Sequence, residues 1–331
     1  MRRIGDGHGR SRLPRPGETA FIGAGMIEAQ MITRRMLIAG AAGVVAPLPA
    51  WAGQDGITND AIQRGRATVP IELNGVGGFR FAVDTAANCS VVAEDLVQRL
   101  GLEPMGELGM HTLVGREIVP AVRADRLRSG ALDARYPRLA VGKRAAMAGL
   151  DGLIGTDLLS AHRLTLNFRG TDRIRIAPSN APARSFRDQF TARTELIALG
   201  ERGFGDLLVI PAVIGLTSGY AIVDTGAEGT LMNRAGAVAG RATPLTLPDG
   251  RTRLRIQSPT GEAITGDAMT LRTLAFAGVT VSNMAVAVGD FHTFRYAGLQ
   301  DQPAILIGLD VFQLFASVYI DLKRSEFVVR L

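Results

Sequence analysis

Two stretches of the chain show the same pattern: alternating apolar residues, a glycine-containing turn, and a second apolar run that ends on an aspartate. The first covers residues 67–84 and ends on Asp84, and the second covers residues 208–224 and ends on Asp224. Alternation on either side of such a turn predicts a β-hairpin whose second strand is buried. A carboxylate at the end of a buried strand is costly unless it has a partner. The repetition therefore suggests that the two acids act together.

The elements that follow each acid also recur in order. A hairpin with a glycine near its tip is predicted around Gly115 and again around Gly261. Further along, two apolar residues and a glycine occur at 153–155 and at 306–308. Landmarks that recur in one order indicate a duplicated unit. We therefore expect a mainly β protein with two related lobes and short helices.

The repeat also sets the expected domain boundaries. We expect residues 1–52 to form a leader, residues 53–177 the N-terminal lobe, and residues 194–331 the C-terminal lobe. Residues 178–193, between the lobes, contain two prolines and scattered polar residues. That composition is typical of a linker.

The leader contains the pattern of an export signal. Arg34 and Arg35 precede an apolar run that ends in an Ala-x-Ala motif at 50–52. An arginine pair in this position resembles a twin-arginine signal, which carries a folded protein across a bacterial inner membrane. We expect cleavage near Ala52/Gly53, the export machinery as a partner, and a periplasmic or secreted protein. The alternative is an inner-membrane anchor, although the apolar run is shorter than the roughly 20 residues that span a bilayer.

The net charge changes once the leader is set aside. The whole chain carries a formal charge of +6, but residues 1–52 hold seven arginines and three acids. The remainder therefore has 30 basic and 28 acidic residues. No stripe of basic and aromatic side chains is left in this part of the sequence, so we expect no nucleic-acid partner.

Other catalytic chemistries lack the residues they need. The single cysteine, Cys89, excludes an internal disulfide, and its neighbours favour a packing role under the loop that follows Asp84. The four histidines are not at metal-ligand spacing, and no Gly-x-Ser-x-Gly motif is present. We therefore expect no metal and no cofactor.

Four other aspartates have structural interpretations. Asp157 and Asp310 come directly after the two apolar-apolar-glycine segments, where an aspartate typically caps the start of a helix. Asp151 and Asp321 are expected in turns or at the surface.

The two acidic stretches resemble the catalytic turns of the aspartic peptidases. The matching motifs are Val83-Asp84-Thr85-Ala86 and Val223-Asp224-Thr225-Gly226. The segments at 153–155 and 306–308 are similar to the strands that cross behind those turns. The residues after these segments are closer to the retropepsin-like bacterial aspartyl proteases than to pepsin. The resemblance covers roughly residue 67 to the C-terminus and implies a bilobal acid-protease fold.

The same resemblance implies roles for the site residues. Asp84 and Asp224 would form the catalytic pair. Thr85 and Thr225 would hydrogen-bond across the lobe interface and fix the two loops relative to each other. Gly226 would let the backbone approach the substrate closely. The two predicted hairpin tips would act as flaps that exclude water.

Two carboxyl groups within hydrogen-bonding distance cannot both ionise cheaply, so they share one proton over a wide acidic range. The ionised member can take a proton from water while the protonated member donates to the scissile carbonyl oxygen. The leading hypothesis is therefore an exported aspartic endopeptidase that cleaves a peptide or protein substrate and does not require an oligomer. On the sequence alone, either aspartate could hold the proton.

Two alternatives stay open. Ala86 stands where the family usually has glycine, and this departure motivates a catalytically inactive protein that holds an extended peptide in the same cleft. A retropepsin-like dimer would instead build each catalytic pair from two chains.

Overall fold

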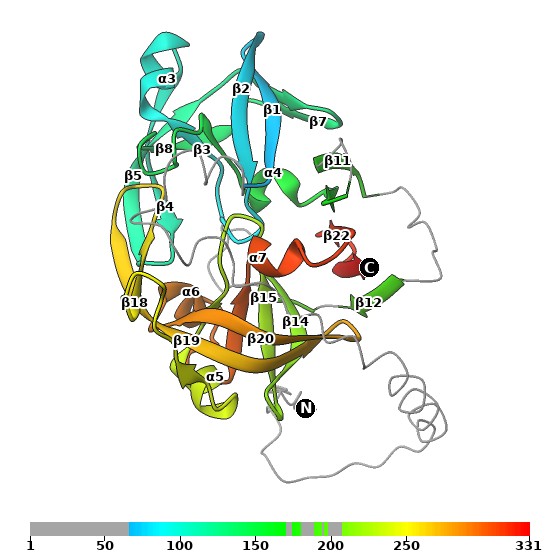
Figure 1. Ribbon diagram of the computed structural model, residues 1–331. Coiled ribbons are helices and arrows are strands. Elements are labelled where there is room, and N and C mark those ends of the chain that lie inside the picture. Colours follow the sequence, from blue (N-terminus) through cyan, green and yellow to red (C-terminus); the bar gives the residue numbers. More distant parts are fainter. Residues whose placement is uncertain (1–65, 170–173, 180–188, 194, 198–206) are drawn as a thin grey trace, which may run out of the picture. The chain divides into compact units, whose positions relative to one another are not determined.

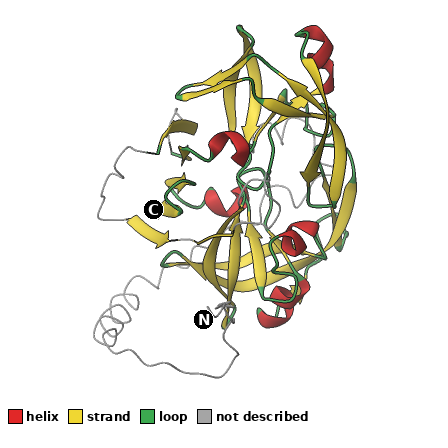
Figure 2. Cartoon of the chain, turned by 180° about the vertical axis from the view of Figure 1, so that it is seen from behind, coloured by secondary structure: helices red, strands yellow, loops and turns green. Residues whose placement is uncertain are grey.

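The computed structural model describes residues 66–169, 174–179, 189–193, 195–197 and 207–331 (Figure 1). The expected leader lies outside these residues. Strands predominate in the described part, and its helices have four to six residues (Figure 2). In the same part, no helix is both long and apolar enough to cross a membrane.

The N-terminal lobe is built on one large sheet. Among the described residues this sheet has nine strands, in the order β4 (Glu103–His111), β5 (Arg116–Arg123), β8 (Arg138–Gly142), β3 (Val91–Ala93), β9 (Gly152–Ile154), β2 (Val76–Val83), β1 (Thr68–Leu73), β6 (Arg126–Ser129) and β7 (Leu132–Arg135). Two short helices, α3 (Glu94–Arg99) and α4 (Thr156–Leu159), follow β3 and β9. The two hairpins predicted in this half are formed by β1–β2 and by β4–β5.

The C-terminal lobe repeats this arrangement. Over the described residues its sheet has the order β13 (Glu195–Ile197), β14 (Leu207–Ile214), β15 (Thr217–Val223), β21 (Ala304–Ile307), β16 (Leu231–Met232), β20 (Val279–Val288), β19 (Ala263–Phe276) and β17 (Thr243–Pro244), with β18 (Arg253–Gln257) paired to β19. Its helices are α5 (Arg234–Ala239), α6 (His292–Tyr296) and α7 (Leu309–Phe312). The predicted mainly β, two-lobed fold is therefore confirmed.

The repeat extends to the pairing of individual strands. β2, which leads into Asp84, pairs in parallel with β9, and β15, which leads into Asp224, pairs in parallel with β21. In each lobe a further short strand, β3 or β16, pairs antiparallel with that crossing strand. The crossing strands are buried along their whole length. Such strands are apolar throughout, as the two segments singled out in the sequence are.

A third sheet joins the two halves of the chain. Its order is β11 (Ile174–Pro178), β10 (His162–Asn167), β22 (Ser317–Asp321), β23 (Glu326–Arg330) and β12 (Gln189–Arg193). Strand β10 of the first half pairs directly with β22 of the second half. Within the expected linker at 178–193, residues 189–193 form β12, and residues 180–188 lie outside the described part.

Asp321 is buried in this third sheet, so the expectation of a turn or surface position is wrong. Its Oδ2 atom accepts from Arg163 Nε at 3.1 Å, and its Oδ1 atom accepts from Ser179 Oγ at 2.6 Å. A buried carboxylate is tolerated where it is both paired and hydrogen-bonded. The pair connects β10 to β22 through side chains as well as through the backbone.

The lobes also share apolar packing. The largest cluster of buried side chains includes Phe81 of the first half and Phe312 and Phe327 of the second. A second cluster lies in the C-terminal lobe, around residues such as Leu207, Ile222 and Phe291, and Ala86 and Leu113 of the N-terminal lobe pack against it. Residues of one lobe therefore contact the other on the side where the acidic loops lie.

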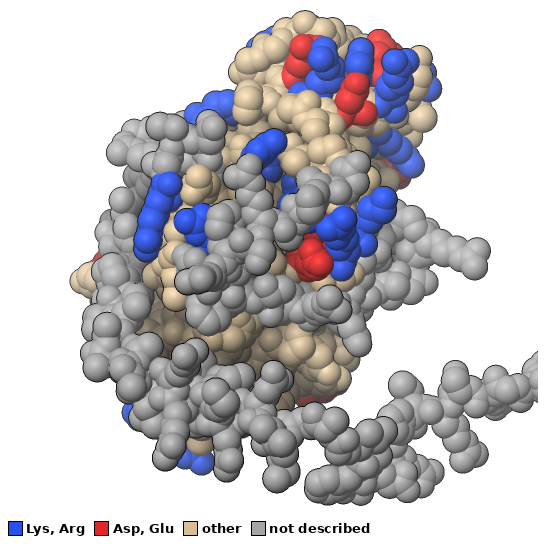
Figure 3. Space-filling view, turned by 90° about the vertical axis from the view of Figure 1, so that its right-hand side faces the viewer, with Lys and Arg blue, Asp and Glu red and all other residues tan. Residues whose placement is uncertain are grey.

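Charged pairs cover the β1, β6 and β7 end of the N-terminal sheet. Arg126 Nε donates to Asp133 at 2.7 Å, and Arg128 lies 3.4 Å from Glu72. Figure 3 shows basic and acidic side chains next to one another at the upper end of the face that it displays. Charges on outer strands oppose pairing with a strand of another chain.

Candidate active site

Asp84 and Asp224 begin two loops that have the same backbone anchor. The N–H of Asp84 donates to the carbonyl of Ile154 in β9 at 2.9 Å, and the N–H of Asp224 donates to the carbonyl of Ile307 in β21 at 3.1 Å. Each aspartate is thus tied to the strand that crosses behind its own loop. The two loops come from one chain.

Each carboxyl group is oriented by two backbone donors of its own loop. Oδ1 of Asp84 accepts from the N–H groups of Ala86 and Ala87, both at 2.9 Å. Oδ1 of Asp224 accepts from Gly226 at 2.7 Å and from the next residue at 3.1 Å. These bonds leave the Oδ2 atoms for the partner aspartate and for a ligand.

Thr85 and Thr225 join the two loops by four reciprocal hydrogen bonds. The hydroxyl of each threonine accepts from the backbone N–H of the other, at 3.2 and 3.1 Å. Each hydroxyl also donates to a carbonyl across the interface, Thr85 to Val223 at 2.7 Å and Thr225 to Val83 at 2.6 Å. Both threonines are fully buried. The loops therefore cannot separate without exposing unpaired polar groups to an apolar interior.

The two carboxyl groups share a side-chain hydrogen bond, and Asp224 is buried while Asp84 is half-buried. Burial raises the pKa of Asp84, while the N–H of Ala86 and the charge of Arg66 act in the opposite direction. Burial also raises the pKa of Asp224, and the negative charge of Asp84 raises it further. One proton is therefore retained by the pair at pH values where an exposed aspartate would be ionised.

Ala86 and Gly226 occupy equivalent positions but differ in the space around them. A methyl group on Gly226 would lie 2.3 Å from the carboxyl carbon of Asp84, so this position requires glycine. Ala86 adopts an ordinary negative φ, packs against the C-terminal cluster, and still donates its N–H to Asp84. The alanine thus preserves the hydrogen bond that the glycine makes in the other loop.

Asp157 and Asp310 support the acidic loops, and Asp310 also accepts from the N–H of Val311 in the first turn of α7 at 2.9 Å, as a capping residue does. The residues at the two helix N-caps are glycines, without a side-chain cap. Oδ1 and Oδ2 of Asp157 accept from Ser90 Oγ at 2.7 Å and Ser90 N at 3.1 Å, and Asp310 accepts the same two bonds from Thr230 at 2.8 and 3.0 Å. Ser90 and Thr230 each lie six residues after a catalytic-loop aspartate, and this matched spacing is the feature of the sequence that indicates their common role.

Both predicted hairpins reach the opposite lobe. At the tip of β4–β5, the carbonyl of Leu113 accepts from the N–H of His292 in α6 at 2.9 Å. At the tip of β18–β19, the carbonyl of Pro259 accepts from the N–H of Lys143 at 3.1 Å. Together the hairpins and the acidic loops line a cavity of about 90 Å³. That volume holds a few water molecules.

Three aromatic rings reinforce the first of these contacts. His111 of the hairpin stacks on Tyr296 of α6, with ring centroids 3.9 Å apart. His111 Nδ1 also lies 3.0 Å from His292 Nε2, which requires that one of the two rings accept and the other donate. Burial lowers the pKa of His292, and the charge of Arg295 lowers it further, so the neutral form that can accept is favoured.

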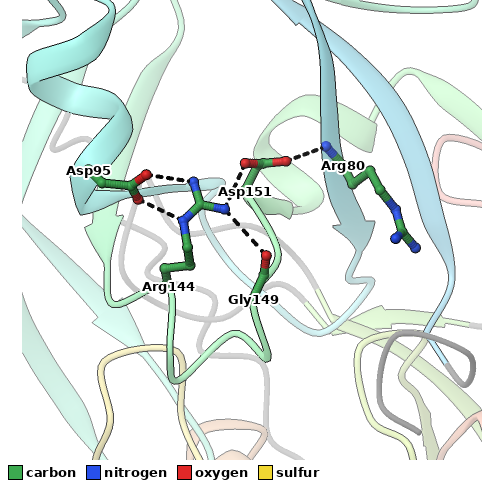
Figure 4. Close-up of polar contacts among 5 residues, drawn as sticks. All are labelled: Arg80, Asp95, Arg144, Gly149 and Asp151. Atoms are coloured by element: carbon green, nitrogen blue, oxygen red, sulfur yellow. Dashed lines mark hydrogen bonds and ion pairs between the residues drawn. The ribbon is translucent and has the colours of Figure 1, made fainter. Parts of the chain in front are cut away.

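The second contact rests on a loop that is tied down by Arg144 (Figure 4). The Arg144 guanidinium bridges Asp95 of α3, with bonds of 2.8 and 2.9 Å, and Asp151, with a bond of 2.8 Å. Asp151 also accepts from the backbone N–H of Arg80 in β2 at 2.7 Å. Lys143, which receives the tip of β18–β19, directly precedes this anchor.

Arg66 and Glu228 are site residues that the sequence analysis missed. Arg66 lines the cavity together with both aspartates. Its Nε atom donates to Glu228 Oε1 at 3.1 Å, and Glu228 follows Asp224 in the second acidic loop. Both side chains are less than one-fifth exposed.

Cys89 is buried beside the first loop, as its neighbours in the sequence predict. Burial raises the pKa of its thiol to about 12, which keeps the thiol protonated. Within the described ranges, no group of three or more His, Cys, Asp or Glu side chains could hold a metal ion.

Comparison with known proteins follows the same two-lobed division. A family model described as aspartyl protease matches residues 69–158 and 210–311, which include both acidic loops. No curated protein sequence matches the chain.

Three solved structures are similar to this chain at low identity. Basic 7S globulin from soybean has 11% identity and a TM-score of 0.42, covering 83% of this chain and 92% of its own. A protein named EDGP has 10% identity and a TM-score of 0.44, covering 80% and 91%. A retropepsin-like aspartic protease from Rickettsia conorii has 15% identity and a TM-score of 0.27, covering 43% and 88%. Because the family model matches more than half of the sequence and spans both lobes, the chain belongs to the aspartyl protease family.

Proposed function

We propose that this protein is an aspartic endopeptidase in which Asp84 and Asp224 together activate a water molecule. The observation that carries the proposal is the hydrogen-bonded pair of carboxyl groups that face a cavity between two loops of one chain. Two carboxyl groups that share a hydrogen bond retain one proton between them, so the site offers a base and an acid at once.

The reaction needs no other group. The ionised carboxylate takes a proton from water as the water oxygen bonds to the scissile carbonyl carbon, and the protonated carboxyl gives its proton to the carbonyl oxygen. The resulting diol collapses when the carbon–nitrogen bond breaks, the amine takes a proton from the pair, and one carboxyl recovers the proton of the diol. The pair then again holds one proton, and no covalent intermediate forms.

This mechanism requires an acidic working range. Activity needs the singly protonated pair, which loses its base when the pH falls below the lower pKa and loses its acid when the pH rises above the higher one. Because burial and mutual repulsion raise the pKa of Asp224, the upper limit lies above that of an ordinary aspartate.

The closed hairpins determine how substrate enters. Each hairpin tip is held to the opposite lobe by a backbone hydrogen bond, so we expect at least one tip to move when an extended peptide binds. When the hairpins close again they exclude bulk water, which strengthens the electrostatic interactions within the site.

The proposed location is the periplasm or the cell exterior. Its support is the signal pattern at residues 33–52, where an arginine pair precedes a short apolar run and an Ala-x-Ala motif. The substrate would then be an exported peptide or an unfolded segment of a protein, held in extended form between the lobes.

Cleavage of an unfolded protein at about pH 4.5 tests the proposal and its two alternatives. Wild type should cleave, Asp84→Asn and Asp224→Asn should not, and Asp301→Asn, an exposed aspartate, should match wild type. An inactive peptide-binding protein predicts no cleavage in any sample. An inter-chain dimer predicts partial activity in each asparagine variant and a dimer on a sizing column.

A further inference from the structure

The two aspartates occupy equivalent positions but have different cross-strand neighbours. In the β1–β2 hairpin, Thr68 pairs with Ala82, and the N–H of Val83 donates to the carbonyl of Ala67 at 2.7 Å. The next step of this register places Arg66 opposite Asp84. Residues directly opposite in an antiparallel pair have their Cβ atoms about 5 Å apart on the same face of the sheet.

In the C-terminal hairpin, the residue opposite the aspartate is apolar. In β14–β15, Val209 pairs with Ile222, so continuing the register places Leu207 opposite Asp224. Leu207 is 1% exposed and belongs to the apolar cluster of the C-terminal lobe. The extended register thus sets an arginine at the position opposite one aspartate and a leucine at the position opposite the other.

The side chain of Arg66 is fixed by its ion pair with Glu228. It is mostly buried, and it lines the same cavity as the two carboxyl groups. A cation beside a buried carboxylate favours the ionised form, and an apolar neighbour favours the protonated form. Burial raises the pKa of both aspartates; at Asp84 the charge of Arg66 offsets part of that rise, whereas at Asp224 the charge of Asp84 adds to it.

We propose that Arg66 breaks the symmetry of the pair, so that Asp84 stays ionised and takes the proton from water, while Asp224 keeps the shared proton and donates it to the scissile carbonyl oxygen. The catalytic part of this assignment rests on the proposed function. Arg66 acts through Asp84 and does not touch the reacting atoms, so it is a positioning residue. Glu228 moderates the effect, since its negative charge offsets part of the charge of Arg66.

Other ionisable groups near Asp84 are shared by all the variants compared below. Cys89 lies on the same loop as a protonated thiol, and Asp157 lies behind that loop. From the hairpin, His111 lines the cavity and contacts His292 of α6. Differences among variants at Arg66 and Glu228 therefore report the charges of that ion pair.

The pH dependence of kcat/KM tests the proposal through opposite shifts. Arg66→Gln should move the acid limb of the profile to higher pH by about 0.5–1 unit. Arg66→Lys keeps the positive charge, so its acid limb should lie close to that of wild type. Glu228→Gln, which leaves Arg66 unopposed, should move the same limb downward. If the ion pair had only a structural role, Arg66→Gln and Glu228→Gln would lower kcat/KM by similar factors, and their acid limbs would not move in opposite directions.

The control is a matched ion pair away from the cavity. Arg128 and Glu72 lie 3.4 Å apart on β6 and β1, with both side chains at least 40% exposed. Arg128→Gln and Glu72→Gln should leave the acid limb where it is in wild type. If Arg66→Gln does not fold, Glu228→Gln and Arg66→Lys still give the sign of the effect.

Carboxyl titration followed by ¹³C NMR gives a readout that does not need turnover. In protein labelled at aspartate, with Asp84→Asn and Asp224→Asn for assignment, the lower titration step should belong to Asp84 and should rise in Arg66→Gln. If the two aspartates titrate in this way but the protein does not cleave a substrate, the proposed function is overturned and the inference about Arg66 stands. A lower step that belongs to Asp224, or no movement of either step in Arg66→Gln, would overturn the inference even in an active enzyme.

Discussion

The two lobes are alike where the backbone must be held and unlike where side chains face the cavity. Reciprocal threonines, paired N–H donors and a carboxylate behind the loop occur in both lobes with nearly the same distances. Facing the cavity, Ala86 replaces the equivalent of Gly226, and Arg66 replaces the equivalent of Leu207. The repeated parts therefore build a site of fixed geometry, and the parts that differ assign unequal roles to its two acids.

The threonine bonds should show the largest effect and the closest symmetry. Thr85→Val and Thr225→Val each leave a buried N–H and a buried carbonyl unpaired, so each should lower the free energy of unfolding by about 2–4 kcal/mol. Urea unfolding measures this, with exposed Thr217→Val as the control. A loss confined to one of the two threonines would contradict the reciprocal role.

The glycine and alanine positions should respond unequally. Gly226→Ala places a methyl group against the Asp84 carboxyl, and a displacement on this scale should lower kcat/KM by about 100-fold or more. Ala86→Gly keeps the N–H donor, so kcat/KM should stay within about threefold of wild type. Similar losses in the two variants would show that the positions are not distinguished as described.

The carboxylate behind the C-terminal loop should make stability depend on pH. Burial raises the pKa of Asp310 to about 6 from an ordinary 3.8. The folded state therefore binds this proton more tightly than the unfolded state, and the contribution is complete at low pH and is lost as the pH rises through about 6. Between pH 4.5 and 7.5 it should fall by about 2 kcal/mol.

Urea unfolding of Asp310→Asn at the two pH values isolates this group. The variant should be less stable than wild type, because asparagine offers one acceptor oxygen where Thr230 and Val311 supply three donors. Its stability should also lack the fall of about 2 kcal/mol over this range. If the variant keeps the full pH dependence of wild type, another group is responsible.

The contact of the first hairpin with α6 should show the smallest effect. His111→Ala removes a ring stacked on Tyr296 and a partner of His292, which should destabilise the closed hairpin by about 1 kcal/mol. Because the N–H of His292 donates to Leu113, its hydrogen exchange should accelerate by roughly fivefold. His111→Phe keeps the stacked ring, so its exchange rate should lie between those of wild type and His111→Ala. Unchanged exchange in His111→Ala would show that this ring does not hold the hairpin against α6.

Much of the fold follows from the sequence because apolar alternation and turn residues are local signals. The hairpins, the buried strands before Asp84 and Asp224, and the crossing strands are all visible as short patterns, and their repetition pairs the two acids without any structure. The buried positions of Asp321 and the loop contacts of Asp157 and Asp310 are not visible in this way. Their partners lie between about 65 and 160 residues away in the sequence.

The position of Arg66 opposite Asp84 cannot be predicted from the sequence, because it depends on a strand irregularity. Counting outward from the turn of the first hairpin, where Leu73 pairs with Val76, would place residue 65 opposite Asp84. An irregularity between Ile71 and Leu73 shifts the register by one residue and brings Arg66 there instead. The second hairpin is regular from Ile214 onward, so counting finds Leu207 correctly. A single bulge thus determines which side chain faces the acid.

The most direct test of the central claim is the loss of kcat/KM when one member of the pair loses its charge without losing its shape. With a peptide substrate at acid pH, Asp224→Asn should lower kcat/KM by at least about 1,000-fold while its urea unfolding stays cooperative. Asp84→Asn should do the same, because the acid and the base are needed in one step. Turnover within tenfold of wild type in either folded variant would contradict the claim that the two carboxyl groups act as one catalytic unit.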